Sequence, residues 1–146
     1  MSNKNTVIVY GLGYVGLTLS IILAENGYKV FGYDTDKSKI KSLNKNKSYL
    51  HEKNIDKRLQ VIKNNKDISY YSDLKNIKAK FHVICVGTPI NKNKKPKKEY
   101  IENVLKDLSK RLNKNDCIIL RSTVPIGFTR KVVIKYLFDK LGYNPQ

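Results

Sequence analysis

The chain has 146 residues, of which 29 are Lys or Arg and 12 are Asp or Glu, so its formal net charge is +17. This length suits one compact domain, and 40% hydrophobic residues can build a core, which argues against a disordered chain. The sequence has no apolar run near the roughly 20 residues of a membrane span, and its first residues are too polar for a signal peptide. We expect a cytoplasmic domain in which Cys85 and Cys117 are buried, reduced thiols, because both lie in apolar runs.

The positive charge favours an anionic partner without specifying one. Lys accounts for 25 of the 29 basic residues, whereas base recognition favours Arg. Two clusters free of acidic residues, Lys37–Lys47 and Lys92–Lys98, contain five Lys each. We interpret them mainly as solvated surface; attraction of an anionic ligand is the second interpretation and nucleic-acid binding the third.

Short apolar runs rich in β-branched residues alternate along the chain with segments of helical period. The first part of the pattern predicts a strand over Thr6–Tyr10, a helix from about Tyr14 to Asn26 stopped by Gly27, a strand over Val30–Tyr33 and a short helix around Ile40 and Leu43. Next come a predicted loop over Ser48–Asn54, a helical segment from Ile55 to Ile62 and an edge strand over Ile68–Tyr71. The last part predicts a strand over Phe81–Val86, an amphipathic helix from Ile101 to Leu112, a strand over Cys117–Leu120 and a last helix from Val132 to Leu141 capped by Gly142.

This alternation predicts the α/β class: a Rossmann-type, doubly wound parallel sheet with strand order 3-2-1-4-5 and helices on both faces. Such sheets bind ligands beyond the carboxyl ends of their strands. In this sequence, those ends carry a Gly-rich loop, Asp34, the Gly87-Thr88-Pro89 turn and Arg121-Ser122-Thr123.

The Gly-rich loop, Gly11-Leu-Gly13-Tyr-Val-Gly16, follows a predicted strand and opens a predicted helix, which is the context of a dinucleotide site. Gly11 permits the tight turn, Gly13 removes the Cβ that would hold a pyrophosphate away, and Gly16 lets helix and strand approach. The helix N-terminus then offers unpaired N–H groups to the phosphates.

Asp34 ends the second strand 18 residues after Gly16, near the spacing of a ribose-binding acid. A carboxylate accepts both ribose hydroxyls but repels a 2′-phosphate, so we expect NAD rather than NADP. Lys37 and Lys39 lie close by in the sequence and would soften this discrimination. The alternative role for Asp34, capping the next turn, suits Asp36 better.

Four motifs together resemble the UDP-glucose/UDP-N-acetylmannosamine dehydrogenases: GLGYVGL after the first strand, GYD at the end of the second, VGTP after the fourth and STVPIG after the fifth. These enzymes oxidise the C6 alcohol of a nucleotide sugar to a carboxylate with NAD, for surface polysaccharide precursors. The resemblance implies a pyrophosphate site at Gly11, Gly13, Tyr14, Val15 and Gly16, a ribose site at Asp34 and Lys39, and a nicotinamide side at Thr88 and Pro89. It also implies cofactor contacts at Gly87, Ser122 and Thr123, with Ser122 shaping the turn and Thr123 as the catalytic residue near the reacting carbon.

The same resemblance implies that residues 1–146 are only the NAD-binding domain. Family members continue with a linking helix and a C-terminal UDP-sugar domain, which supply the catalytic Cys and Lys. We therefore expect the sheet to lack a sixth strand, Cys117–Arg121 to lie at an uncapped edge, and the isolated chain to bind NAD without turnover. The UDP-sugar and a homodimer belong to the complete enzyme. The family's Glu-Pro-Gly-Leu segment reads Glu52-Lys53-Asn54-Ile55 here, and Pro96-Lys97-Lys98 lacks an expected acid.

Several alternatives remain open on the sequence. A free-standing NAD-sensing module, like the regulatory domains of potassium channels, has this length but does not explain STVPIG or VGTP. We expect His82 to be a core imidazole and His51 with Glu52 to be a surface pair, and we find no metal-ligand spacing. Arg121 suits an anion contact or a structural salt bridge equally. We expect neither a nucleic-acid nor a membrane partner.

Overall fold

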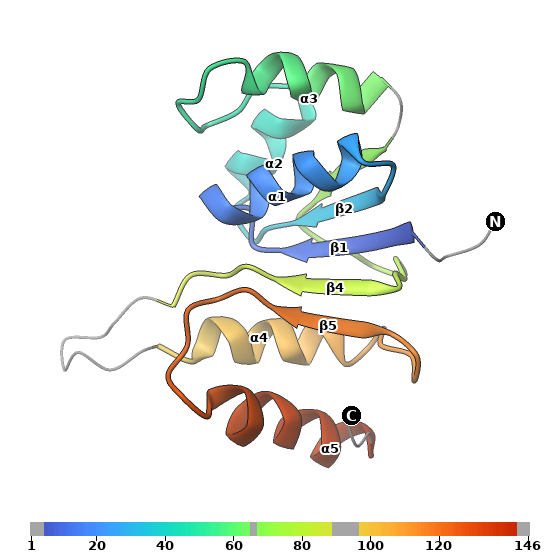
Figure 1. Cartoon of the computed structure of the whole chain (residues 1–146), viewed down its shortest axis with the longest axis vertical. Helices are drawn as coiled ribbons and strands as arrows, with labels where there is room; N and C mark the ends of the chain where they lie inside the picture. Colours follow the sequence, from blue (N-terminus) through green and yellow to red (C-terminus); the bar gives the residue numbers. More distant parts are fainter. Residues whose placement is uncertain (1–4, 65–66, 89–96, 143–146) are drawn as a thin grey trace.

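The five strands predicted from the sequence form one parallel sheet. The computed structural model describes residues 5–64, 67–88 and 97–142 (Figure 1). The strands are β1 (Thr6–Tyr10), β2 (Lys29–Tyr33), β3 (Ile68–Tyr71), β4 (Phe81–Ile84) and β5 (Cys117–Leu120). Their order is β3-β2-β1-β4-β5, as predicted, and every pair is parallel.

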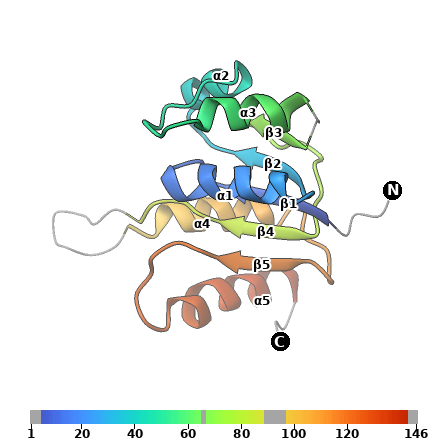
Figure 2. The same cartoon turned by 45° about the horizontal axis from the view of Figure 1, so that its top comes forward.

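Helices cover both faces of the sheet. They are α1 (Tyr14–Glu25), α2 (Lys37–Asn44), α3 (Ile55–Asn64), α4 (Glu99–Leu108), the π-helical turn η2 (Thr129–Ile134) and α5 (Lys135–Leu141). Figure 2 shows α1 in front of the sheet and α4 behind it. In the described part of the chain, none of these helices has the length and apolar character needed to cross a bilayer.

Side chains of β1 alternate between two apolar cores, as expected for a central strand. Val7 and Val9 pack with the buried faces of α1, α2 and α3. Ile8 and Tyr10 pack with α4, η2 and α5 on the other face. Because β1 is buried on both faces, its carboxyl end, where the Gly-rich loop begins, is held firmly.

Two helix boundaries follow from capping residues. The Asp36 carboxylate accepts the backbone N–H of Ser38 at 2.9 Å and of Lys39 at 3.3 Å, so Asp36 is the N-cap of α2, as predicted. Gly142 ends α5 in the left-handed conformation, with φ of 64°. The last helical segment begins earlier than predicted, because η2 already starts at Thr129.

The prediction that both cysteines are buried is wrong. Cys117 is exposed and Cys85 is only half-buried. Strand β5 is an edge strand, as expected from the resemblance, and only its Ile118 and Leu120 pack into a core. Cys117 and Ile119 point to the other face and are exposed, so an apolar run here does not mean burial.

The segment Ser72–Lys80 links β3 to β4 with no helix of its own. The buried Arg111, just beyond α4, donates to the carbonyls of Lys75 at 2.8 Å and Ile77 at 3.4 Å. Its guanidinium also pairs with the Asp107 carboxylate at 3.0 Å. One side chain therefore satisfies two of the backbone carbonyls of this crossing.

His82 lies in the core, as predicted. Its ring is fully buried in β4, and Nδ1 forms a hydrogen bond with the Tyr10 hydroxyl at 3.0 Å. Nε2 lies 3.7 Å from the Asp116 carboxylate, beyond hydrogen-bond distance. The imidazole therefore belongs to the interior of the domain, away from the carboxyl ends of the strands.

Candidate functional site

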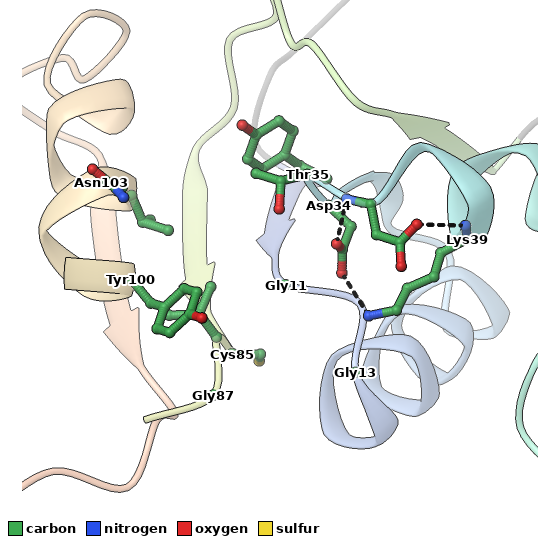
Figure 3. Close-up of a pocket in the computed structure, with 13 residues that line it drawn as sticks. Gly11, Gly13, Asp34, Thr35, Lys39, Cys85, Gly87, Tyr100 and Asn103 are labelled. Atoms are coloured by element: carbon green, nitrogen blue, oxygen red, sulfur yellow. Dashed lines mark hydrogen bonds and ion pairs between the residues drawn. The ribbon is translucent and has the colours of Figure 1, made fainter. Parts of the chain in front are cut away.

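A cavity of about 420 Å³ opens at the carboxyl ends of β2, β1 and β4. Figure 3 shows Gly13, Asp34 and Lys39 on one side and Cys85, Gly87, Tyr100 and Asn103 on the other. The lining residues are Gly11, Gly13, Tyr33, Asp34, Thr35, Asp36, Lys39, Cys85, Val86, Gly87, Tyr100, Asn103 and Val104. This is the crevice where the strand order reverses, the usual ligand position in such sheets.

The three glycines of the Gly-rich loop meet different constraints. Gly11 has φ of 88°, and a Cβ there would lie 2.9 Å from the Val86 backbone. A Cβ at Gly16 would collide with the carbonyl oxygen of Gly11. A Cβ at Gly13 would meet no protein atom within 4 Å, so the space beside Gly13 is open. The first and third glycines are required by the fold, whereas the second leaves room for a ligand.

The N-terminus of α1 opens onto this space. Gly13 is the N-cap of α1 and makes no side-chain cap, and the first turn contains no acidic residue. Tyr14 and Val15, the first two helical residues, have exposed side chains. Backbone N–H groups at such a terminus and the helix dipole attract phosphate groups.

Asp34 lies at the end of β2, largely buried, with 9% of its surface exposed. One carboxylate oxygen accepts the Leu12 N–H at 2.8 Å and the other accepts the Asp36 N–H at 2.9 Å. The Lys39 ammonium lies 3.5 Å from the first oxygen. Each carboxylate oxygen can accept more than one hydrogen bond, so Asp34 can still receive a ligand hydroxyl.

The residues after β4 and β5 lie beside the cavity. Gly87 lines it, but Thr88, Ser122 and Thr123 do not. The Thr88 hydroxyl donates to the Thr123 carbonyl at 2.6 Å, and the Ser122 hydroxyl donates to the Val86 carbonyl at 2.7 Å. These bonds join the ends of β4 and β5, so both motifs meet in space. Pro89 lies outside the described residues.

Several lining residues had no signal in the sequence. Tyr100 and Asn103 project from α4 at i and i+3, and Tyr100 is half exposed. The helical period identifies the buried face of α4, but it does not say which exposed positions face a ligand. Thr35 directly follows Asp34 and Cys85 lies two residues before Gly87, and both line the cavity.

The remaining sequence candidates lie outside the cavity. Within the first Lys cluster only Lys39 lines it, and most of the second cluster lies outside the described residues. Arg121 is exposed, and no carboxylate among the described residues pairs with it. Glu52 accepts a hydrogen bond from the Tyr14 hydroxyl. The described residues contain no cluster of three or more His, Cys, Asp or Glu suited to a metal ion.

Comparison with known families agrees with this geometry. Residues 5–144 match the model of the UDP-glucose/GDP-mannose dehydrogenase family, NAD binding domain. The chain belongs to this family. The matched region is the NAD-binding domain, and its cofactor is NAD. The open space beside Gly13 and the carboxylate of Asp34 fit the phosphates and a ribose of that cofactor. A free-standing NAD-sensing module is not favoured, because the match includes STVPIG.

Three individual relatives place the domain within longer proteins. UDP-glucose 6-dehydrogenase of Campylobacter jejuni is 31% identical over 144 residues, which are 96% of this chain and 36% of that protein. The structure of UDP-D-ManNAc dehydrogenase from Pyrococcus horikoshii has a TM-score of 0.91 at 29% identity, covering 96% of this chain and 33% of that one. GDP-mannose dehydrogenase of Pseudomonas aeruginosa, in a ternary complex, has a TM-score of 0.87 at 31% identity over 94% and 33%. The chain thus spans about a third of these relatives.

Proposed function

We propose that this domain binds NAD for an enzyme that oxidises the C6 alcohol of a nucleotide sugar to a carboxylate. The observation that carries the proposal is one cavity bounded by both Gly13, at the N-terminus of α1, and Asp34, at the end of β2. A dinucleotide bound to such a sheet places its phosphates at the helix N-terminus and a ribose hydroxyl at the acid that follows the second strand. The STVPIG and VGTP motifs, joined through Thr88 and Thr123, support the choice of enzyme family.

The pyrophosphate occupies the space beside Gly13. Gly11 and Gly16 give the loop its shape, and the backbone N–H groups at Tyr14 and Val15 donate to the phosphate oxygens. An anionic pyrophosphate is favoured there by the helix dipole and by the net positive charge of the chain.

The adenosine half extends toward β2. Asp34 accepts the ribose hydroxyls, and Lys39 holds the carboxylate from the other side. The adenine base lies between Thr35 and the α4 residues Tyr100 and Asn103, which form the opposite wall of the cavity.

The nicotinamide half extends toward the ends of β4 and β5. Gly87, Thr88 and Ser122 shape this side, and the Thr123 hydroxyl lies near the reacting carbon. The Thr123 backbone carbonyl accepts the Thr88 hydroxyl at 2.6 Å, which holds the turn that carries the Thr123 side chain.

The catalytic Cys and Lys and the residues that bind the nucleotide sugar belong to other segments of the complete enzyme, which we propose is a homodimer. Cys85 lies half-buried in the cavity wall, and Cys117 projects from the edge strand. Neither cysteine matches the family's nucleophile motif. The 146-residue chain by itself binds NAD and does not oxidise a nucleotide sugar.

Isothermal titration calorimetry with NAD and NADP tests the cofactor site directly. We expect NAD to bind more tightly than NADP, and no NADH to form with UDP-glucose, UDP-N-acetylmannosamine or GDP-mannose. Absence of NAD binding would refute the proposed site. NADH formation by the chain alone would refute the requirement for a second segment.

A further inference from the structure

The loop between α2 and α3 is attached to the Gly-rich loop at two points. The Tyr49 hydroxyl donates to the carbonyl of Leu12, and the Tyr14 hydroxyl donates to the carboxylate of Glu52. The two attached residues of the Gly-rich loop lie on either side of Gly13. Neither Tyr49 nor Glu52 lines the cavity, so both act on the Gly-rich loop from outside the site.

The bond from Tyr49 fixes the direction of one N–H group. The Leu12–Gly13 peptide is trans, so its carbonyl oxygen and its N–H point in opposite directions. Because Tyr49 holds the carbonyl, the N–H of Gly13 is turned away from Tyr49, and Gly13 lines the cavity. The N–H of Leu12 donates to Asp34 at 2.8 Å. Both peptide groups of Leu12 are therefore held.

The surroundings of Tyr49 hold its ring in place and keep its hydroxyl protonated. The Lys39 ammonium lies 5.5 Å from the centre of its ring and 3.5 Å from the Asp34 carboxylate. Burial raises the pKa of Tyr49, and the negative charges of Asp34 and Asp36 raise it further. The hydroxyl therefore remains protonated and able to donate at neutral pH.

The α2–α3 loop has its own internal bonds. The Ser48 N–H donates to the Asp56 carboxylate in the first turn of α3 at 2.7 Å. The Leu50 N–H donates to the Ser48 hydroxyl at 2.9 Å. These contacts fix the segment that carries Tyr49 and Glu52, so it can hold another loop in place.

We propose that Tyr49 and Glu52 are positioning residues, which hold the Gly-rich loop in the conformation that receives the cofactor's pyrophosphate. This inference rests on the proposed NAD site. It gives a role to the segment where the Glu-Pro-Gly-Leu of the family is replaced by Glu52-Lys53-Asn54-Ile55.

The first test is Tyr49→Phe, which removes the hydroxyl but keeps the ring beside Lys39. Calorimetry should show NAD and ADP-ribose binding about two- to tenfold more weakly, the effect of one hydrogen bond. Binding of adenosine, which has no pyrophosphate, should change by less than twofold in ligand-observed NMR. Tyr28→Phe is the matched control, because Tyr28 is also half-buried and lies at the opposite ends of the strands.

The second test is a double-mutant cycle on the exposed pair Tyr14 and Glu52. Tyr14→Phe and Glu52→Ala should each weaken NAD binding about two- to fivefold, and the double variant should bind no more weakly than either. Glu52→Gln, which keeps an acceptor oxygen, should bind NAD at least as tightly as the parent chain. Thermal unfolding of each variant without ligand verifies that it is folded.

Three results would overturn the inference while leaving the proposed function intact. The first is unchanged NAD affinity in Tyr49→Phe and Glu52→Ala. The second is an equal loss for adenosine and ADP-ribose, which indicates general loosening of the domain. The third is tighter NAD binding in Glu52→Ala, which indicates that Glu52 acts only as a repelling charge. If the parent chain binds no NAD, the proposed function and this inference both fail.

Discussion

The carboxylate of Asp34 accepts the backbone N–H of Leu12 at 2.8 Å. The acid at the end of β2 is therefore part of the Gly-rich loop's own support as well as a ligand group. Its second oxygen accepts the N–H of Asp36, the N-cap of α2, at 2.9 Å. Replacing Asp34 thus affects both the cofactor and the fold, and the two effects must be measured separately.

Asp34→Ala should cost about 1.5–3 kcal/mol of NAD binding, the range for a hydrogen bond to a charged group. It should also lower the free energy of unfolding by about 1–3 kcal/mol, because the N–H groups of Leu12 and Asp36 lose their acceptor. Calorimetry and urea unfolding measure the two losses. Asp139→Ala, on the exposed side of α5, is the control and should change neither. Unchanged NAD affinity in Asp34→Ala would remove Asp34 from the site.

Alanine at two glycines of the same loop should have opposite consequences. At Gly13 the new methyl group meets no protein atom within 4 Å, so the unfolding midpoint should stay close to that of the parent chain while NAD affinity falls at least tenfold. At Gly16 the methyl group collides with the Gly11 carbonyl, so stability should fall by about 1–3 kcal/mol or more. Thermal unfolding with and without NAD distinguishes the two. A Gly13→Ala chain that binds NAD normally would contradict the proposed pyrophosphate position.

The two thiols should react at different rates. Cys117 is exposed on β5, whereas Cys85 is half-buried, and burial raises the pKa of its thiol despite the nearby positive charge of Arg121. Iodoacetamide at pH 8 should therefore label Cys117 first and Cys85 at least several-fold more slowly. Bound NAD should slow Cys85 further and leave Cys117 unchanged, as followed by peptide mass spectrometry. Equal protection of both thiols would point to a global change rather than to cofactor in the cavity.

Stability should fall as the pH is lowered from about 7, because of His82. Burial lowers the pKa of His82 from its ordinary 6.5, and the neighbouring Asp116 carboxylate only partly offsets this. The unfolded chain then binds a proton near pH 6.5 that the folded chain does not, which favours unfolding by up to about 1.4 kcal/mol per pH unit. Urea unfolding at pH 7.5, 6.5 and 5.5 measures the slope.

The exposed His51 provides the control for this titration. His51→Gln should keep the pH dependence between pH 7.5 and 5.5, whereas His82→Gln should flatten it. A slope that survives in His82→Gln would assign the effect to another group.

The sheet and its ligand-bearing end could be predicted from the sequence because both depend on local patterns. β-Branched runs such as Thr6–Tyr10 indicate the strands, and the Gly-rich loop after the first strand favours the strand order of the doubly wound dinucleotide-binding sheet. Gly11, Gly13 and Asp34 were predicted at the rim of one crevice, and they line one cavity.

What the sequence did not predict depends on contacts between distant segments. Tyr49 and Leu12 are 37 residues apart, and Arg111 and Lys75 are 36 apart, so no local period indicates either pair. The exposure of Cys117 was missed for a related reason. A residue pattern describes the strand itself, whereas burial also depends on whether another element lies over that strand.

In the crossing between β3 and β4, two backbone carbonyls depend on a single cation. A helix in that position would satisfy its own carbonyl groups, but Ser72–Lys80 contains no helix. The carbonyls of Lys75 and Ile77 receive their hydrogen bonds from Arg111 instead. Because a guanidinium is flat and offers several donors at fixed angles, a lysine could not reproduce these contacts. The path of this segment therefore depends on the side chain at position 111.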